Sequence, residues 1–528
     1  MTTLPVKSVE VYDTTLRDGT QGENVSLSVD DKLKVTLLLD ELGVDYIEGG
    51  WPGSNPKDHE YFQLVQELDL KHAKVAAFGM TCRVGVDPAD DTNMQAFVES
   101  EAGVVTIVGK TSMLHVREVI RADPEENLRI IDDSLRYLKG IGREVIYDAE
   151  HFFDGYKLDS EYSLLTLKVA LEAGATRLVL CDTNGGSMPW EVEDMTRIVA
   201  ERFPMAKLGI HCHNDGEVAV ANTLAAVRRG AIQVQGTING YGERCGNADL
   251  CSVIPDLELK MGVQCLPEGS LKNLTHVART VAEIANLAPD NQAAYVGKSA
   301  FAHKGGMHAA AVRRNQDSYQ HIDPTLVGNA PRILVSDLAG RGNMLSKAEE
   351  YGLNLSPDAA SEVVTRIKEL ESRGFVFEGA EASVEMLMRR MSPDYKPPFV
   401  MKDFTAVVEH RAGRGLFAEA TIKLMVDGEE FHTVAVGNGP VDALDNAMRK
   451  ALMPVFPELD KFQLADYKVR ILDGENGTAS TTRVLIDTRN GHQRWSTVGA
   501  STNIIEASWL ALADSVEYGL SQVMKCCD

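Results

Sequence analysis

Short apolar runs alternate with longer amphipathic segments along the first half of the chain. The segment from Ser28 to Gly43 has apolar residues at helical spacing, and a second such segment runs from Ser160 to Gly174. Serine commonly begins a helix and glycine commonly ends one, so both segments predict helices. The runs predict strands, because they are short and rich in β-branched residues. They cover residues 9–13, 44–50, 74–79, 104–109, 144–150, 177–183, 208–215 and 232–240.

Strands that alternate with helices imply a parallel sheet. Eight such units in about 250 residues predict a closed (β/α)8 barrel, a TIM barrel. An open doubly wound sheet is the alternative, but no G-x-G-x-x-G motif follows the first run. Active sites of parallel α/β folds lie at the carboxyl ends of the strands, so polar residues there are candidates for function. They are Arg17, Asp18, Glu150, Asp182, Thr183, His211 and His213.

The rest of the chain follows other patterns. Residues 260–390 are mainly helical around a Gly- and His-rich loop at 297–310, and the proline-rich segment 391–400 reads as a linker. Beyond it, three strand-like segments and a helix occur twice, which predicts an α+β domain with a duplicated βββα unit, either regulatory or merely dimerising. We expect a catalytic barrel over 1–265, helical lid and linker subdomains over 266–400, and an allosteric, dimerising domain over 401–528.

Composition narrows the function classes. The chain is 44% hydrophobic and 25% charged, as in ordinary globular proteins. Its net charge of −24 disfavours a nucleic-acid partner. No apolar stretch reaches the ~20 residues that cross a bilayer, and the N-terminus lacks the pattern of a signal peptide, so we expect a cytoplasmic protein without a membrane partner. The eight cysteines form no C-x-x-C pair and are expected to be free thiols.

One strand carries a candidate metal site. His211 and His213 are two residues apart, so their imidazoles share a face and can converge on one ion. In a closed barrel, strands one, seven and eight are neighbours, so Asp18 can join them and Asn247 can complete the ligand set. Such mixed ligands suit Mg²⁺, Mn²⁺, Co²⁺ or Zn²⁺ as a Lewis acid. Arg17, beside Asp18, can hold negative charge that develops on a substrate oxygen. A single histidine in a strand is more often an ordinary core residue.

Three motifs together are specific: YDTTLRDGTQGEN at 12–24, HCHND at 211–215 and GYGERCGNADL at 240–250. They resemble the DRE-type metal-dependent barrel enzymes that join acetyl-CoA to a 2-oxo acid, the family of isopropylmalate, homocitrate and citramalate synthases. The resemblance covers nearly the whole chain, including the tail. The segments most similar to the citramalate synthases within this family are 48–58, 147–157 and 300–312.

The resemblance implies roles for individual residues. A divalent metal, Mg²⁺ or Mn²⁺ ahead of Zn²⁺ or Co²⁺, would be bound by Asp18, His211, His213 and Asn247. Arg17 would polarise the keto oxygen, and Thr183, which could also cap a helix, would bind the carboxylate of the oxo acid. Glu150 matches a catalytic glutamate.

The resemblance also implies a lid that supplies a base. His308 would deprotonate the acetyl methyl group, with Tyr319 further along the same segment. Relatives often have His-x-Asp where this chain has His308-Ala309-Ala310. An aspartate would orient the imidazole and raise its basicity, so its absence shifts part of the base work to Glu150 or a water.

Within the family, the implied substrates are pyruvate and acetyl-CoA, with isoleucine as a feedback inhibitor at the tail and a homodimer as the assembly. Isopropylmalate synthase, which uses 2-oxoisovalerate, and homocitrate synthase are the alternatives. Side chains around Phe78, Met80 and Tyr147 would decide among them, because one methylene is worth only about 1–3 kcal/mol of discrimination. Tyr147 is our candidate for the pocket wall. A metal-dependent acyl-CoA lyase and a ligand sensor using the tail alone are further alternatives, which the GERCGNA loop and the complete metal set disfavour.

Overall fold

The computed structural model describes residues 6–304, 308, 311–312, 314–336, 339–392, 394–413, 415–472, 474–491 and 493–525. The chain forms two compact units, Met1–Phe301 with Ile322–Ala330, and Ala302–His321 with Pro331–Asp528. The domain boundaries expected after residues 265 and 400 stay predictions. Among the described residues, no helix has both the length and the apolar character needed to cross a bilayer. The six described cysteines are free thiols, and Cys526 and Cys527 lie outside the described residues.

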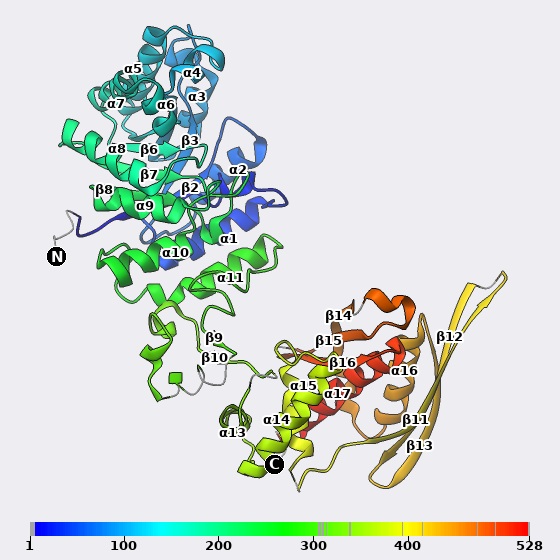
Figure 1. Ribbon diagram of the computed structural model, residues 1–528. Coiled ribbons are helices and arrows are strands. Elements are labelled where there is room, and N and C mark those ends of the chain that lie inside the picture. Colours follow the sequence, from blue (N-terminus) through cyan, green and yellow to red (C-terminus); the bar gives the residue numbers. More distant parts are fainter. Residues whose placement is uncertain are drawn as a thin grey trace. The chain divides into compact units, whose positions relative to one another are not determined.

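Eight parallel strands close into a barrel in the first unit (Figure 1). Neighbours follow in chain order, and β1 pairs with both β2 and β8, which closes the ring. Each of the apolar runs forms one of these strands, which confirms the expected (β/α)8 barrel. The strands are β1 (Glu10–Asp13), β2 (Tyr46–Gly50), β3 (Lys74–Met80), β4 (Val104–Lys110), β5 (Glu144–Glu150), β6 (Arg177–Asp182), β7 (Leu208–Cys212) and β8 (Ala231–Gly236).

Helices follow the strands and surround the barrel (Figure 1). The first, α1, begins after Ser28 and ends at Gly43 in the left-handed conformation (φ 93°), as expected. Helix α7 also ends as expected, at Gly174, but its N-cap is Asp159, whose carboxylate accepts a hydrogen bond from the first turn; the expected cap, Ser160, is the first helical residue. The helices are α1 (Val29–Leu42), α2 (Pro56–Val65), α3 (Thr92–Glu99), α4 (Met113–Glu118), α5 (Pro124–Gly140), α6 (Phe152–Leu158), α7 (Ser160–Ala173), α8 (Pro189–Arg202), α9 (Ala219–Arg228), α10 (Leu250–Pro255) and α11 (Leu274–Ile284).

Two layers of side chains pack on the barrel strands. Successive residues of a strand point to opposite faces, so one set fills the barrel and the other packs against the helices. On β5, Ile146 belongs to the interior cluster, whereas Val145 and Tyr147 belong to the outer core. The same alternation places Asp148 and Glu150 on the inner face, toward the carboxyl end of the barrel.

The second unit begins with helices and a short sheet. Buried Met344, Val363 and Met388 belong to one apolar cluster that holds the helices together. The elements are the parallel pair β9 (Ala302–His303) and β10 (Arg332–Ile333), followed by α13 (Arg341–Glu350), α14 (Pro357–Ser372) and α15 (Glu381–Arg390).

The tail contains the expected unit twice, each an antiparallel three-stranded sheet followed by a helix. Alternate residues of β12, from Ala418 to Val426, are buried against α16, and the second copy repeats this arrangement with α17. This confirms the duplicated βββα unit. The first copy is β11 (Val400–Arg411), β12 (Gly415–Val426), β13 (Glu429–Gly437) and α16 (Pro440–Leu452); the second is β14 (Gln463–Ile471), β15 (Thr482–Asn490), β16 (Gln493–Ser501) and α17 (Ile504–Lys525).

Candidate metal and substrate site

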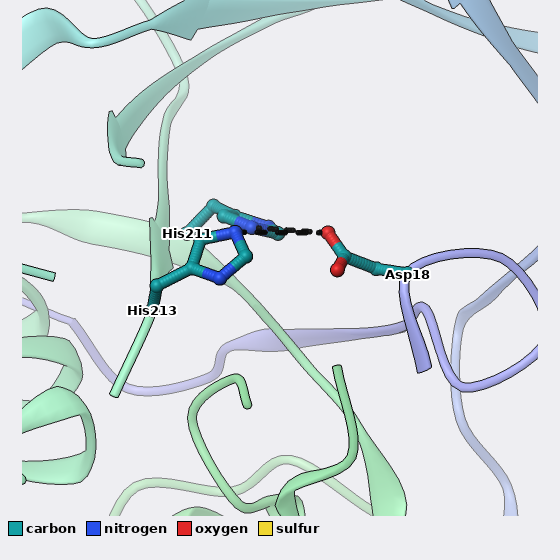
Figure 2. A group of neighbouring side chains, drawn as sticks. All are labelled: Asp18, His211 and His213. Carbon is teal, nitrogen blue, oxygen red and sulfur yellow. Dashed lines mark ion pairs between the residues drawn. The ribbon is translucent and has the colours of Figure 1, made fainter. Parts of the chain in front are cut away.

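Three side chains from two segments of the barrel converge at the carboxyl ends of its strands (Figure 2). His211 lies on β7, His213 follows that strand directly, and Asp18 stands on the turn after β1. Asp18 Oδ2 lies 3.6 Å from His211 Nε2 and 3.8 Å from His213 Nε2. The ligand atoms of all three lie within 4.8 Å of one another. One ion can therefore contact all three.

The protonation states suit a cation. Burial, and then the neighbouring His213, lower the pKa of His211 to about 4. Burial also lowers the pKa of His213. Burial acts to raise the pKa of Asp18, but Arg17 and the two imidazoles outweigh it and hold that pKa well below its usual range. At neutral pH the three groups therefore offer two neutral imidazoles and a carboxylate, the forms that bind metals.

Asn247 lies beside this group on the loop after β8. It forms an isolated antiparallel bridge with His213, and its amide nitrogen donates to the carbonyl of Tyr241 at 3.2 Å. Within the described part of the chain, Asn247 Oδ1 and Asp18 Oδ1 are buried oxygens without a hydrogen-bond partner. Gly242 (φ 153°) permits this loop to pass closely, because a Cβ there would lie 2.1 Å from the Asn247 amide. Unpartnered buried acceptors beside two neutral imidazoles fit a divalent cation.

Arg17 is fixed on three sides at the edge of this site. Its Nε donates to Glu48 Oε2 at 2.6 Å, and its Nη1 lies 3.1 Å from Asp18 Oδ2. The guanidinium stacks 3.8 Å above the centre of the Phe78 ring. Glu48 also accepts a hydrogen bond from the Tyr12 hydroxyl. The guanidinium group of Arg17 is therefore held in one orientation next to the carboxylate of Asp18.

Glu150 and Thr183 stand on neighbouring strand ends. Glu150 ends β5 and pairs with Lys110, which ends β4. The Thr183 hydroxyl accepts a hydrogen bond from the backbone N–H of His151 at 2.9 Å, and His151 has a left-handed backbone (φ 56°). Thr183 does not cap the next helix, α8, whose N-cap is Met188, so that alternative is wrong.

Tyr147 does not reach this mouth. It is fully buried in the outer core, and a Cβ on Gly109 would lie 2.7 Å from its ring. The cause is the alternation of β5, which gives the inner face to Asp148 instead. At β5 the residue on the inner face is therefore Asp148, a carboxyl group rather than a phenol. Phe78 lies under the guanidinium of Arg17, and the expected part of Phe78 and Met80 in substrate choice stays a prediction.

His308 and Tyr319 belong to the second unit. Their rings stack with centroids 4.2 Å apart and planes 26° apart, and both residues are exposed. Ala309 and Ala310 lie outside the described residues. The structure thus brings His308 and Tyr319 together with each other, and their expected role as a lid stays a prediction.

Polar side chains inside the strands escaped the sequence analysis. Glu48 on β2, Lys110 on β4, Asp148 on β5 and Gln235 on β8 all lie near the carboxyl ends of buried strands. Their signal in the sequence is a charged or amide residue at alternate positions of an otherwise apolar run, as in EVIYDAE and IQVQG. Such residues have no reason to be buried unless they bind one another or a ligand.

Comparison with known proteins gives the family. Residues 8–281 match the family described as HMGL-like, residues 295–374 the homocitrate synthase post-HMGL domain-like family, and residues 378–520 the LeuA allosteric (dimerisation) domain.

Relatives match the chain over nearly its full length. The (R)-citramalate synthase of Geobacter sulfurreducens is 53% identical over 515 residues, which are 97% of each chain. That of Aquifex aeolicus is 50% identical over 97% of this chain and 98% of its own. That of Synechocystis sp. is 49% identical over 97% of this chain and 96% of its own. With the metal-binding geometry of its barrel and a match of this extent, the chain belongs to the (R)-citramalate synthases of the HMGL-like family.

Proposed function

We propose that the barrel mouth condenses acetyl-CoA with pyruvate and water to give (R)-citramalate and CoA, with a divalent cation bound by Asp18, His211, His213 and Asn247. The observation that supports this is the convergence of the ligand atoms of Asp18, His211 and His213 in a chain about half identical to (R)-citramalate synthases. Mg²⁺ or Mn²⁺, when bound, supplies a Lewis acid to the keto and carboxylate oxygens of the 2-oxo acid.

Arg17 stabilises the charge that forms during the condensation. Attack on the keto carbon of pyruvate turns its keto oxygen into an alkoxide, and a fixed guanidinium next to that oxygen lowers the barrier. Glu48 and the Phe78 ring hold the guanidinium before the substrate arrives. Little reorganisation is then needed in the transition state.

Thr183 orients pyruvate through its carboxylate. The hydroxyl oxygen already accepts a hydrogen bond from the N–H of His151. Its own proton is therefore free to be donated, and a carboxylate oxygen of the 2-oxo acid is the natural acceptor.

The proton transfers need a base. We assign removal of the acetyl methyl proton to His308, with Tyr319 stacked on its ring, and a supporting role to Glu150, whose carboxylate pairs with Lys110. The methyl carbon then bonds to the keto carbon, and the alkoxide takes up a proton. Water finally cleaves the thioester, which releases CoA and makes the sequence irreversible.

The tail is proposed to join two copies and to bind isoleucine. Its sheets expose apolar side chains that a second copy would bury, among them Val407, Leu416, Val436, Leu464 and Ile471. The LeuA allosteric (dimerisation) domain match supports both roles. Light scattering should give a dimer, and calorimetry should detect isoleucine binding that pyruvate weakens, because coupling between two sites is reciprocal. Leucine is the second candidate ligand and is tested alongside; the absence of isoleucine binding would contradict the regulatory proposal.

A panel of 2-oxo acids tests the reaction itself. CoA release is followed with pyruvate, 2-oxoisovalerate and 2-oxoglutarate at equal concentration and with Mg²⁺ present. Pyruvate should give the highest kcat/KM, and mass spectrometry should identify citramalate. A higher kcat/KM with 2-oxoisovalerate would assign the chain to isopropylmalate synthesis instead.

A further inference from the structure

A chain of three buried side chains leads away from the metal-binding face of His211. Gln235 Oε1 lies 3.0 Å from His211 Nδ1, the ring nitrogen on the side away from Asp18. The amide nitrogen of Gln235 in turn donates to Asp148 Oδ1 at 3.2 Å. All three residues are at most 5% exposed. They come from β7, β8 and β5, so the last hydrogen bond spans the barrel interior between strands that are not neighbours.

The hydrogen bonds from His211 through Gln235 to Asp148 have a fixed donor and acceptor order when His211 binds a metal. His211 Nε2 faces Asp18, so this nitrogen must be free of a proton to act as a ligand. The proton then sits on Nδ1 and needs an acceptor, which is the oxygen of the Gln235 amide. With its oxygen so placed, the amide presents its NH₂ group to Asp148, whose Oδ1 accepts.

Loss of either partner would undo this arrangement. An amide can turn over and present NH₂ to Nδ1, and that orientation favours the other tautomer, with the proton on Nε2 and aimed at Asp18. Asp148 opposes the turn because its oxygen accepts from the NH₂ group. Among the residues that the structure describes, His213 has no such support, since its Nδ1 is buried without a partner.

We infer that Gln235 and Asp148 are positioning residues that fix the tautomer of His211, so that its Nε2 lone pair faces the metal site. The inference rests on the metal site proposed above. Partners of this kind typically change metal affinity by about 10- to 100-fold when they are removed.

The barrel offers a matched control. Gln233 lies two residues earlier on β8, faces the same interior and is fully buried, but its amide is 3.5 Å from Glu10 at the other end of the barrel. Gln235→Met and Gln233→Met therefore make the same chemical change on one strand and face, with and without His211 as a neighbour.

The experiment measures Mn²⁺ affinity of the metal-stripped full chain by calorimetry and electron paramagnetic resonance, with circular dichroism as the check on folding. Gln235→Met should weaken Mn²⁺ binding about 10- to 100-fold, while Gln233→Met leaves it unchanged. Asp148→Leu should weaken it too, and Asp148→Asn, which keeps an oxygen acceptor, should restore most of the affinity.

Three results would overturn the inference. Wild-type affinity in Gln235→Met would show that the tautomer needs no support. Equal losses in the two glutamine variants would point to barrel packing alone. If the wild-type chain binds no Mn²⁺, the metal site and the inference both fail. Wild-type affinity in Gln235→Met, by contrast, overturns only the inference and leaves the proposed reaction intact.

Discussion

The barrel holds a cluster of charged and polar side chains at each end, and the two clusters differ in how completely their charges are paired. At the amino ends of the strands lie Glu10, Tyr46, Lys74, Glu144 and Arg177, each the first residue of its strand; we call them the amino-end cluster. Arg177 donates two hydrogen bonds to Glu10, at 2.5 and 2.6 Å, and one to Glu144 at 2.8 Å. Lys74 and Tyr46 also donate to Glu144. Two carboxylates thus face two cations.

At the carboxyl ends of the strands, carboxyl groups outnumber basic side chains. The mouth cluster consists of Arg17, Asp18, Glu48, Lys110, Asp148 and Glu150, which are four carboxyl groups and two basic side chains. Burial, and then the neighbouring charge of Glu48, raise the pKa of Asp148 well above its usual range. Asp18 still keeps a buried oxygen without a partner among the described residues. Burial of charge therefore does not by itself mark a site; incomplete pairing does.

The largest effect should come from the mouth. His213→Ala removes one of three converging ligands, and chelation removes the metal from the intact set. We expect either change to lower CoA release by more than about a thousandfold, because deleting a single oxyanion donor already costs about 100- to 1,000-fold. Metal content by mass spectrometry and the rate of CoA release should fall together, and Mg²⁺ or Mn²⁺ should rescue the chelated wild type. An active His213→Ala variant without metal would remove this group from the mechanism.

The amino-end cluster should respond in the opposite way. Arg177→Met leaves Glu10 and Glu144 without their shared cation, and removing one partner of a buried ion pair costs about 3–5 kcal/mol of unfolding free energy. Denaturant unfolding should show this loss, while metal content and the rate per folded molecule stay at wild-type values. The double variant Arg177→Met with Glu10→Gln should recover part of the stability. A selective loss of activity would contradict a purely structural role.

Much of the barrel and of its metal-ligand group could be predicted from the sequence. The apolar runs located every strand of the barrel, and barrel closure placed Asp18 near His211 and His213 because strands one and seven both adjoin strand eight. Helix ends were predicted correctly where glycine adopts the left-handed conformation that ends a helix, as at Gly43 and Gly174. At α7, Asp159 and Ser160 are both residue types that cap helices, and the predicted cap, Ser160, was wrong by one residue.

The inner and outer faces of the strands were harder to predict. Barrel strands are buried on both sides, so hydrophobicity does not reveal which of the two alternate sets of residues points into the barrel. The phase of β5 therefore went unrecognised, and Tyr147 was assigned to the pocket that Asp148 faces. The hydrogen bond between Asp148 and Gln235 joins strands that are neither neighbours nor close in sequence, so no local pattern announces it.

Glu48 offers a finer test of the mouth. Arg17 and Tyr12 each donate a hydrogen bond to the carboxylate of Glu48. Glu48→Gln keeps the shape of this side chain but removes its charge and one of the two acceptor oxygens. A hydrogen bond to a charged group is worth about 1.5–3 kcal/mol, so we expect kcat to fall roughly tenfold or more, with a smaller change in KM for acetyl-CoA. Glu144→Gln is the matched control at the amino end and should leave kcat unchanged. Equal kcat values for the two variants would show that Glu48 does not position Arg17.

The smallest effect is a pH dependence of stability at the amino end. Burial acts to raise the pKa of Glu144, but the bonds from Lys74 and Tyr46 and the charge of Arg177 outweigh it, so the pKa lies below its usual value of 4.5. A carboxyl group whose pKa is lowered in the folded state contributes stability above its unfolded pKa, and this contribution is lost as the pH falls through the folded pKa. Glu144→Gln should therefore have a lower Tm than the wild type at pH 7, and the difference should narrow steadily below about pH 4.5. A difference that stays constant on acidification would mean that the carboxylate charge contributes nothing and that Glu144 acts only through its shape and its hydrogen bonds.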